Sequence, residues 1–192
     1  MFIALEGADG SGKTVVSKAL TNYLREQGME VIYTFEPTID NEYGRTVRSL
    51  LNQKTMKDPL HFTHLLTADR KCHLKSTILP ALSAGKWVIC DRYKYSALAY
   101  QRMQGISPEY LVDINSSFLT PDLVCILQPE TVATLLQRMT ERGGKKEHFE
   151  NKDMLESIIS LYYQVPSFFP DDNIHFLNAE LPVPSLVSKI VE

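Results

Sequence analysis

The stretch GADGSGKT at positions 7–14 constrains this chain more than any other part of its sequence. It fits the pattern GxxxxGK[ST], in which glycines let the backbone curl so that successive N–H groups point at phosphate oxygens. Such a loop needs a strand before it and a helix after it, because the helix adds the positive end of its dipole. The apolar run FIALE at 2–6 precedes the loop, and Val16, Leu20 and Leu24 recur at helical spacing after it. The chain therefore begins with a predicted strand, phosphate-binding loop and helix.

The rest of the chain alternates short apolar runs with segments of helical pattern. Four further strands are expected at 30–35, 87–91, 123–127 and 173–179. Helices are expected at 13–28, 43–51, 59–82, 96–103, 108–118, 129–140, 153–165 and 184–191. Pro80 is expected to bend or end the helix at 59–82. Because short buried strands that alternate with helices form parallel sheets, we predict one α/β domain over 1–192, with a five-stranded parallel sheet and helices on both faces.

Composition limits the classes of function that fit. With 192 residues, 44% hydrophobic and 22% charged, the chain can bury one sizeable core. A net charge of −3 gives no general attraction to nucleic acid, so a bound anion must be held by a local cluster of Lys and Arg. Cys90 and Cys125 lie inside apolar runs and no CxxC pair exists, which favours core positions and a cytoplasmic setting. Residues 2–5 are too short for a signal-peptide core, and no run approaches the roughly 20 apolar residues of a membrane span.

Each position of the loop has a chemical task in this interpretation. Lys13 would reach the β- and γ-phosphates of ATP, and the hydroxyl of Thr14 would hold Mg²⁺. The predicted ATP cradle consists of Gly7, Ala8, Asp9, Gly10, Ser11, Gly12, Lys13 and Thr14. A glycine-rich turn without a ligand is the alternative, but the strand and helix patterns beside the loop favour nucleotide binding, with ATP and Mg²⁺ as cofactors.

Two large classes of nucleotide-binding protein are excluded by missing motifs. A GTPase switch would need the base-reading motif NKxD, which the sequence lacks. A motor ATPase usually carries an acidic pair after four apolar residues, whereas WVICDR at 87–92 ends in Asp91 and Arg92. Asp91 would bind Mg²⁺, partly through water, and Arg92 would contact a phosphate that is being moved. This pair suits phosphoryl transfer between two nucleotides, and a surface ion pair is the alternative.

Several motifs together resemble those of the thymidylate kinases, the P-loop enzymes that transfer phosphate from ATP to dTMP. The matching segments are EGADGSGKT (6–14), EPT (36–38), GRTVR (44–48), ADR (68–70), DRYKYSALAYQ (91–101) and RMTERGGKKEHFE (138–150). They occur in the family's order, and the last is similar to its lid. The resemblance implies a P-loop NTPase fold with a short lid at about 138–150, a Mg-nucleotide site, a homodimer, and ATP-dependent phosphorylation of dTMP to dTDP.

The resemblance also implies which residues hold the acceptor, dTMP. Asp9 would meet its 3′-hydroxyl and Arg70 its base, while Arg48 and Arg92 would contact its phosphate, because arginine forks suit phosphate and carbonyl oxygens. The remaining acceptor-site residues are Glu36, Leu66, Ser96, Tyr100 and Gln101. The bulk of Tyr100 would crowd the 2′ position of the sugar. Simpler interpretations stay open, since Asp9 could cap amides of the loop and Tyr100 could be a core aromatic residue.

The glycine at position 10 resembles one group of family members. In that group this position is also glycine, and the catalytic arginine comes from the lid and not from the loop. Arg142, with Arg138 or Lys146, would then neutralise the transferring phosphoryl group when the lid closes. The predicted catalytic residues are Lys13, Arg92, Arg142 and Asp9. A charged run is otherwise typical of a solvated helix face, and that alternative applies to Arg138 and Arg142.

Three features of the sequence depart from the family's pattern. Phe35 stands where an arginine is often found before Glu-Pro, and Thr38-Ile39-Asp40 replaces Gly-Gly-Thr. Leu66 stands where an aromatic ring usually stacks on thymine, an interaction worth roughly 1–3 kcal/mol per base in nucleic-acid proteins. Two alternatives therefore stay open: a kinase for another or several (deoxy)nucleoside monophosphates, and a nucleotide-binding protein without turnover.

Four residues of types that can bind metal ions lie close together in the sequence: His61, His64, Cys72 and His73. Their spacing fits no standard zinc pattern, and an amphipathic helix explains them better than a zinc site does.

Overall fold

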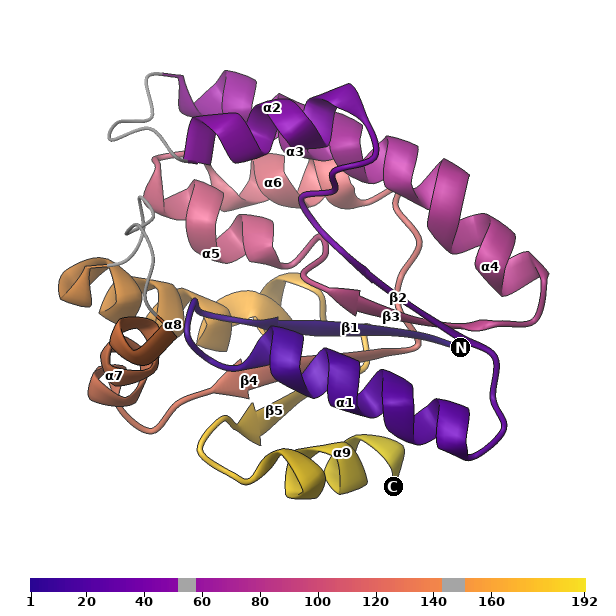
Figure 1. The fold of residues 1–192 in the computed structure, drawn as a ribbon. Helices are drawn as coiled ribbons and strands as arrows, with labels where there is room; N and C mark the ends of the chain where they lie inside the picture. Colours follow the sequence, from indigo (N-terminus) through magenta and orange to yellow (C-terminus); the bar gives the residue numbers. More distant parts are fainter. Residues whose placement is uncertain (52–57, 143–150) are drawn as a thin grey trace.

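The central sheet has five parallel strands in the order β2-β3-β1-β4-β5 (Figure 1). The computed structural model describes residues 1–51, 58–142 and 151–192, apart from the side chain of Arg142. The strands are β1 (Phe2–Gly7), β2 (Val31–Phe35), β3 (Trp87–Asp91), β4 (Leu123–Gln128) and β5 (Ile174–Asn178). The prediction of a five-stranded parallel sheet is confirmed, because every neighbouring pair is parallel.

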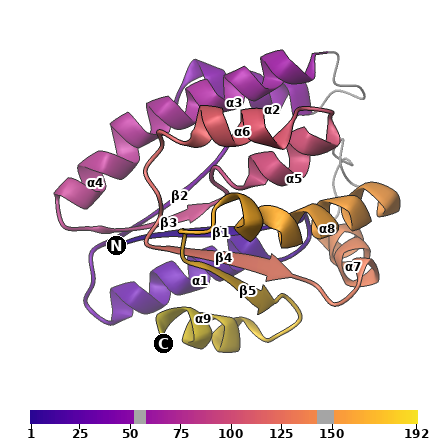
Figure 2. The ribbon, with the colours of Figure 1, turned by 180° about the vertical axis from the view of Figure 1, so that it is seen from behind.

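Helices cover both faces of this sheet. They are α1 (Lys13–Glu26), α2 (Glu42–Leu51), α3 (Pro59–His73), α4 (Leu79–Ser83), α5 (Ser96–Met103), α6 (Pro108–Asn115), α7 (Val132–Arg142), α8 (Lys152–Phe168) and α9 (Val183–Val191). Figures 1 and 2 show α1 and α9 on one face, with α2 to α6 and α8 on the other. None of the helices in the described ranges has the length and hydrophobicity that crossing a bilayer requires.

The alternation of side chains along the strands creates two separate cores. On one face, Leu5 and Ile89 pack with the buried stripe of α1, which includes Leu20, and with α9. On the other face, Ala4 and Cys90 pack with residues of α5, α6 and α8. Because successive strand residues point to opposite faces, a fully apolar strand is needed where both faces are covered. Cys90 and Cys125 are buried in these cores, as the sequence predicted.

The helix expected at 59–82 extends from Pro59 to Ser83 and contains one irregularity. A wider π turn over Leu74–Ile78 lies between α3 and α4, and the N–H of Leu79 bonds to the carbonyl of Leu74. Pro80 is the second residue of α4, so the helix does not end at the proline. The change in hydrogen-bond pattern lies in the π turn that precedes it.

The crossovers of the sheet determine where a ligand can enter. The loop after β1 leads to α1 on one face, while the loop after the neighbouring β3 leads to α5 on the opposite face. Because the two connections diverge at the carboxyl edge, a crevice opens between them, and ligands of open α/β sheets bind at such points. The fold therefore brings the loop at 7–14 and the Asp91-Arg92 pair to the two sides of one crevice.

Candidate active site

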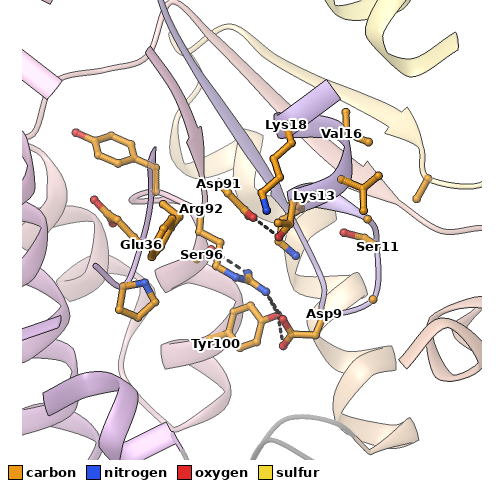
Figure 3. A pocket seen from close by; sticks show the side chains of 18 of the residues that line it. Asp9, Ser11, Lys13, Val16, Lys18, Glu36, Asp91, Arg92, Ser96 and Tyr100 are labelled. Atoms are coloured by element: carbon orange, nitrogen blue, oxygen red, sulfur yellow. Dashed lines mark hydrogen bonds and ion pairs between the residues drawn. The ribbon is translucent and has the colours of Figure 1, made fainter. Parts of the chain in front are cut away.

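A cleft of about 1040 Å³ opens at this carboxyl edge (Figure 3). The predicted site residues that line it come from seven separate segments of the chain. They are Asp9, Gly10, Ser11, Gly12, Lys13, Thr14, Glu36, Arg48, Leu66, Arg70, Asp91, Arg92, Ser96, Tyr100, Gln101 and Arg138. The cleft is also lined by Tyr33, Phe35 and Phe62. Its volume and its polar groups suit two nucleotides placed end to end more than one small ligand.

The loop at its edge has the backbone shape that its glycines predicted. Gly7, Gly10 and Gly12 have φ angles of 136°, 82° and 93°, in the region that side chains other than glycine rarely adopt. Gly10 is also packed closely against α7, since a Cβ atom there would lie 2.9 Å from the carbonyl oxygen of Leu135. The loop therefore needs glycine at position 10 for its conformation and for the approach of α7.

Lys13 is folded over the loop. Its Nζ donates a hydrogen bond to the carbonyl oxygen of Ala8 at 2.8 Å, and its side chain is buried. Burial, together with the nearby Arg92 guanidinium, lowers the pKa of Lys13 to about 8. An anion on the loop would offset this repulsion, so the geometry favours a ligand that brings negative charge.

Thr14 and Asp91 face each other across the crevice. The Thr14 hydroxyl donates to Asp91 Oδ2 at 2.5 Å, which joins the start of α1 to the end of β3. A hydroxyl and a carboxylate oxygen are the hard ligands that Mg²⁺ takes in nucleotide sites, with water and phosphate completing its shell. The donor set thus fits the metal predicted at these two residues.

Arg92 lies at the centre of the site, and its own backbone has a strained conformation. Its φ of 68° lies in the left-handed region, and its N–H bonds to the carbonyl of Leu5 at 2.9 Å. The guanidinium donates to Asp9 Oδ1 and to the Tyr100 hydroxyl, and it lies over the Tyr100 ring (Figure 3). Such strain at a charged residue is typical of functional sites.

Asp9 is an ion-pair partner and does not cap the loop. Besides Arg92, its carboxylate accepts a hydrogen bond from the Tyr100 hydroxyl at 3.0 Å. Burial alone would raise the pKa of Asp9, but Arg92 and Lys13 outweigh it and hold that pKa below its usual value. The carboxylate is therefore ionised at neutral pH and lines the cleft.

Glu6 is a central residue that the sequence interpretation missed. Its carboxylate is fully buried and accepts hydrogen bonds from the Tyr93 N–H at 2.8 Å, Ser96 Oγ at 2.6 Å and Tyr162 OH at 3.0 Å. Burial raises its pKa. A charged residue at the end of an apolar strand was the available signal, because such a carboxylate must be paired. Through Tyr162, Glu6 connects α8 with the segment that carries Arg92.

Arg70 of α3 is built into the wall of the cleft. Its side chain is only 4% exposed, and Nε donates to Glu36 Oε2 at 2.8 Å. Its terminal nitrogens donate to Asn115 Oδ1 and to the Tyr93 carbonyl. These bonds hold the guanidinium in one orientation while it still lines the cleft.

Arg48 lines the same cleft as Arg70, but a backbone carbonyl and not a carboxylate holds its guanidinium. Its Nε donates to the carbonyl of Pro37 at 2.9 Å, and its guanidinium lies 5.0 Å from the centre of the Phe35 ring. Phe35, which replaces an arginine of the family pattern, thus provides a stacking surface for Arg48. Arg45, three residues before Arg48 on α2, is exposed to solvent.

Leu66 lies on one face of α3, midway between Phe62 and Arg70. The three residues are four apart and line the same cleft. Ala97, Tyr100 and Gln101 of α5 line it as well. The aromatic ring absent at position 66 is therefore present one helical turn earlier, at Phe62.

Part of the lid lies outside the described residues. Arg138 of α7 lines the cleft beside Gly12, whereas Arg142 ends that helix and its side chain is outside the described part of the chain. Lys146 also lies outside it.

Among the described residues, no group of three or more His, Cys, Asp or Glu side chains could hold a metal ion.

The family model for thymidylate kinases matches residues 5–190. The chain belongs to the thymidylate kinase family. It is 39% identical over 195 residues to a probable thymidylate kinase of Pyrococcus abyssi, covering 99% of this chain and 93% of that one. It is 38% identical over 191 residues to a thymidylate kinase of Brachyspira hyodysenteriae, covering 99% and 91%. The crystal structure of a thymidylate kinase from Ehrlichia chaffeensis matches with a TM-score of 0.77 and 26% identity, covering 100% of this chain and 96% of that one.

Membership of the thymidylate kinase family makes the chain a nucleoside monophosphate kinase, whose reaction is ATP-dependent phosphorylation of dTMP. The P-loop NTPase fold predicted from the sequence is confirmed by the likeness to the solved thymidylate kinase. The loop at 7–14 and the arginines Arg48, Arg70 and Arg92 line one cleft.

Proposed function

We propose that this chain transfers the γ-phosphoryl group of ATP to dTMP between the loop at 7–14 and Arg92. The main support for the proposal is the ion pair between Arg92 and Asp9. It joins the loop at 7–14, which would bind ATP, to the residue after β3 that would bind the phosphate of dTMP. The new bond forms between a dTMP phosphate oxygen and the γ-phosphorus, and the bond to the β-phosphate oxygen breaks. Catalysis of this kind is positioning and charge stabilisation, with little covalent chemistry by the protein.

On the donor side, the N–H groups of the loop bind the phosphates of ATP. Lys13 exchanges its bond to Ala8 for the β- and γ-phosphates. Thr14 and Asp91 would hold Mg²⁺, partly through water, which would neutralise charge on those phosphates when bound. Arg142, with Arg138 or Lys146, neutralises the moving phosphoryl group from the lid, because Gly10 supplies no charge in the loop.

On the acceptor side, Arg48 and Arg92 bind the phosphate of dTMP and Asp9 accepts the hydrogen bond of its 3′-hydroxyl. Arg70 contacts the base, in a slot lined by Glu36, Leu66, Ser96 and Gln101. Tyr100 excludes a 2′-hydroxyl by bulk. The hydroxyl of Tyr100 already bonds to Asp9, so the sugar meets a preorganised pair.

The family resemblance supports two further proposals about how the enzyme works in the cell. The first is that the active enzyme is a homodimer, and the second is that it works in the cytoplasm. The three cysteines are free thiols, which fits a reducing compartment. Neither proposal alters the assignment of residues in the cleft.

A coupled ADP-release assay tests the function, with dTMP, dUMP, dCMP, dGMP and UMP as acceptors. We expect the highest kcat/KM with dTMP. Turnover with none of the five would overturn the kinase proposal, and higher turnover with dGMP would overturn the thymidylate assignment. Comparable turnover with several pyrimidine nucleotides would favour a relaxed kinase, for which the replacement of an aromatic residue by Leu66 is the motivating observation.

A further inference from the structure

His73 lies behind the acceptor wall and is part of a buried polar chain that leads into the cleft. Its Nδ1 is 3.1 Å from Glu36 Oε1, and its Nε2 is 2.6 Å from Thr34 Oγ1. Glu36 Oε2 in turn accepts from Arg70 Nε at 2.8 Å. The chain Thr34–His73–Glu36–Arg70 thus runs from the rigid strand β2 to a guanidinium that lines the cleft.

Both nitrogens of the His73 ring have specific partners, and the ring is only 2% exposed. The tautomer with its proton on Nδ1 donates to Glu36 and accepts from the Thr34 hydroxyl, so it satisfies every polar atom of the ring. Because Thr34 is part of the central sheet, its hydroxyl fixes the plane of the ring.

The carboxylate of Glu36 depends on two donors, one for each oxygen. His73 occupies Oε1 and Arg70 occupies Oε2. If the histidine contact is removed, one buried carboxylate oxygen loses its partner and the carboxylate can turn away from Arg70. Because the Arg70 fork is also held by Asn115 and the Tyr93 carbonyl, a turn of Glu36 would change its angle without removing it.

Arg70 and His73 lie three residues apart at the end of α3, so they share one helix face and both reach Glu36. A π turn over Leu74–Ile78 begins directly after His73. π turns inside helices are frequent at functional sites.

We propose that His73 is a positioning residue for dTMP, which sets the orientation of Arg70 through Glu36. The inference rests on the proposed function, since it takes Arg70 to contact the base of the acceptor. It assigns no contact between His73 and the substrate. A positioning role predicts weaker acceptor binding, with ATP binding and the chemical step little changed.

The test measures KM for dTMP, KM for ATP, kcat and the melting temperature of His73→Phe and His73→Gln. For His73→Phe we expect KM for dTMP to rise about tenfold, with KM for ATP and kcat within about threefold of the wild type. His73→Gln, whose amide can donate to Glu36 and accept from Thr34, should restore most of the loss. His64→Phe is the matched control on the same helix, because His64 is exposed and bonds only to Tyr110 among the described residues.

A double-mutant cycle with Arg70→Lys separates this inference from the proposed function. If His73 acts through Arg70, His73→Phe should change KM for dTMP far less in the Arg70→Lys background than in the wild type. If Arg70→Lys weakens dTMP binding but His73→Phe does not, or if the two effects simply add, the positioning role is overturned and the proposed function stands. If Arg70→Lys itself leaves dTMP binding unchanged, the assignment of Arg70 in the proposed function fails, and this inference fails with it.

Discussion

Arg92 and Asp9 form an ion pair across the crevice, and the Tyr100 hydroxyl bonds to both of them. Arg92 follows β3 whereas Asp9 follows β1, so the pair connects the two crossovers that diverge at the carboxyl edge. Because Arg92 contacts the loop at 7–14 and lines the cleft, the proposed reaction has it stabilise charge on both nucleotides. The consequences of the site geometry can be tested one residue at a time.

Arg92→Lys should lower kcat/KM for dTMP by about a hundredfold or more, because an ammonium cannot reproduce the fork that contacts Asp9 and a phosphate together. Steady-state kinetics with dTMP varied at saturating ATP measures the change. Arg45→Lys is the control, because Arg45 is exposed on α2 and its guanidinium bonds only to the Ile39 carbonyl among the described residues. Equal kinetics for the two variants would contradict the role of Arg92.

When ATP binds, Lys13 should take up part of a proton near pH 8.5 and none near pH 6.5. The pKa of Lys13 in the free protein is about 8, and the phosphates of ATP should raise it, so a lysine that is partly neutral at pH 8.5 becomes charged on binding. Titration calorimetry in buffers of different ionisation enthalpy counts the protons. Lys13→Met should abolish the uptake, and uptake that persists in this variant would assign it to another group.

The same pKa predicts how stability changes with pH in the absence of nucleotide. Lys13 binds its proton less tightly in the folded protein than in the unfolded one, where its pKa is 10.5. The free energy of unfolding should therefore gain a favourable contribution as the pH rises from about 8 towards 10.5. Thermal melts of the wild type and Lys13→Met across this range isolate the contribution, which should be missing from the variant.

Arg142→Ala should lower kcat by about a hundredfold or more with a small change in KM for ATP, if the lid supplies the charge that Gly10 does not. Arg138→Ala tests the second lid arginine in the same way. Lys152→Ala is the control for removal of a nearby exposed cation, because Lys152 pairs with Glu156 on the surface of α8. If neither arginine variant slows the reaction, the charge comes from elsewhere in the site.

Leu66→Phe should lower KM for dTMP several-fold, because one stacked base is worth roughly 1–3 kcal/mol. Kinetics with dTMP, dUMP and dGMP measure the effect on each acceptor. Leu60→Phe is the control, because Leu60 is exposed near the start of the same helix. An increased KM would indicate that Phe62 already fills the place of the base-stacking ring.

Gly10→Ala should destabilise the protein by more than Gly28→Ala does. Both glycines have nearly the same positive φ, 82° and 83°, so the backbone cost of roughly 1–2 kcal/mol is shared. Only Gly10 has a backbone neighbour within 3 Å of the added Cβ, whereas Gly28 has open space. Denaturant unfolding measures the difference between the two variants. Equal losses in the free energy of unfolding would show that α7 shifts to make room for the added Cβ without a measurable cost.

The sequence predicted the parts of the molecule that depend on local pattern. The strand that ends at Glu6, the glycine loop and the segment from Asp91 to Gln101 were recognisable because their chemistry is contained in a few neighbouring residues. The partners of Glu6 come instead from Tyr93, Ser96 and Tyr162, up to 156 positions away in the chain. No spacing rule relates such residues.

Two further features escaped prediction for a different reason. Pro80 signals a break, but the resulting π turn depends on how α3 packs and not on the proline alone. The position of Phe62 in the cleft depends on the helix to which Leu66 belongs and on α5 opposite it. Periodicity places these residues on a helix face, but it does not say which cavity that face meets.

The left-handed backbone at Arg92 is held in place by the side chain of the same residue. A φ of 68° costs a residue other than glycine roughly 1–2 kcal/mol, and the ion pair with Asp9 and the bond to the Tyr100 hydroxyl offset this cost. Glycine would remove the backbone strain but would leave the partly buried Asp9 carboxylate without its cation. Selection for heat resistance alone would therefore retain arginine here, so stability and turnover constrain this position in the same direction.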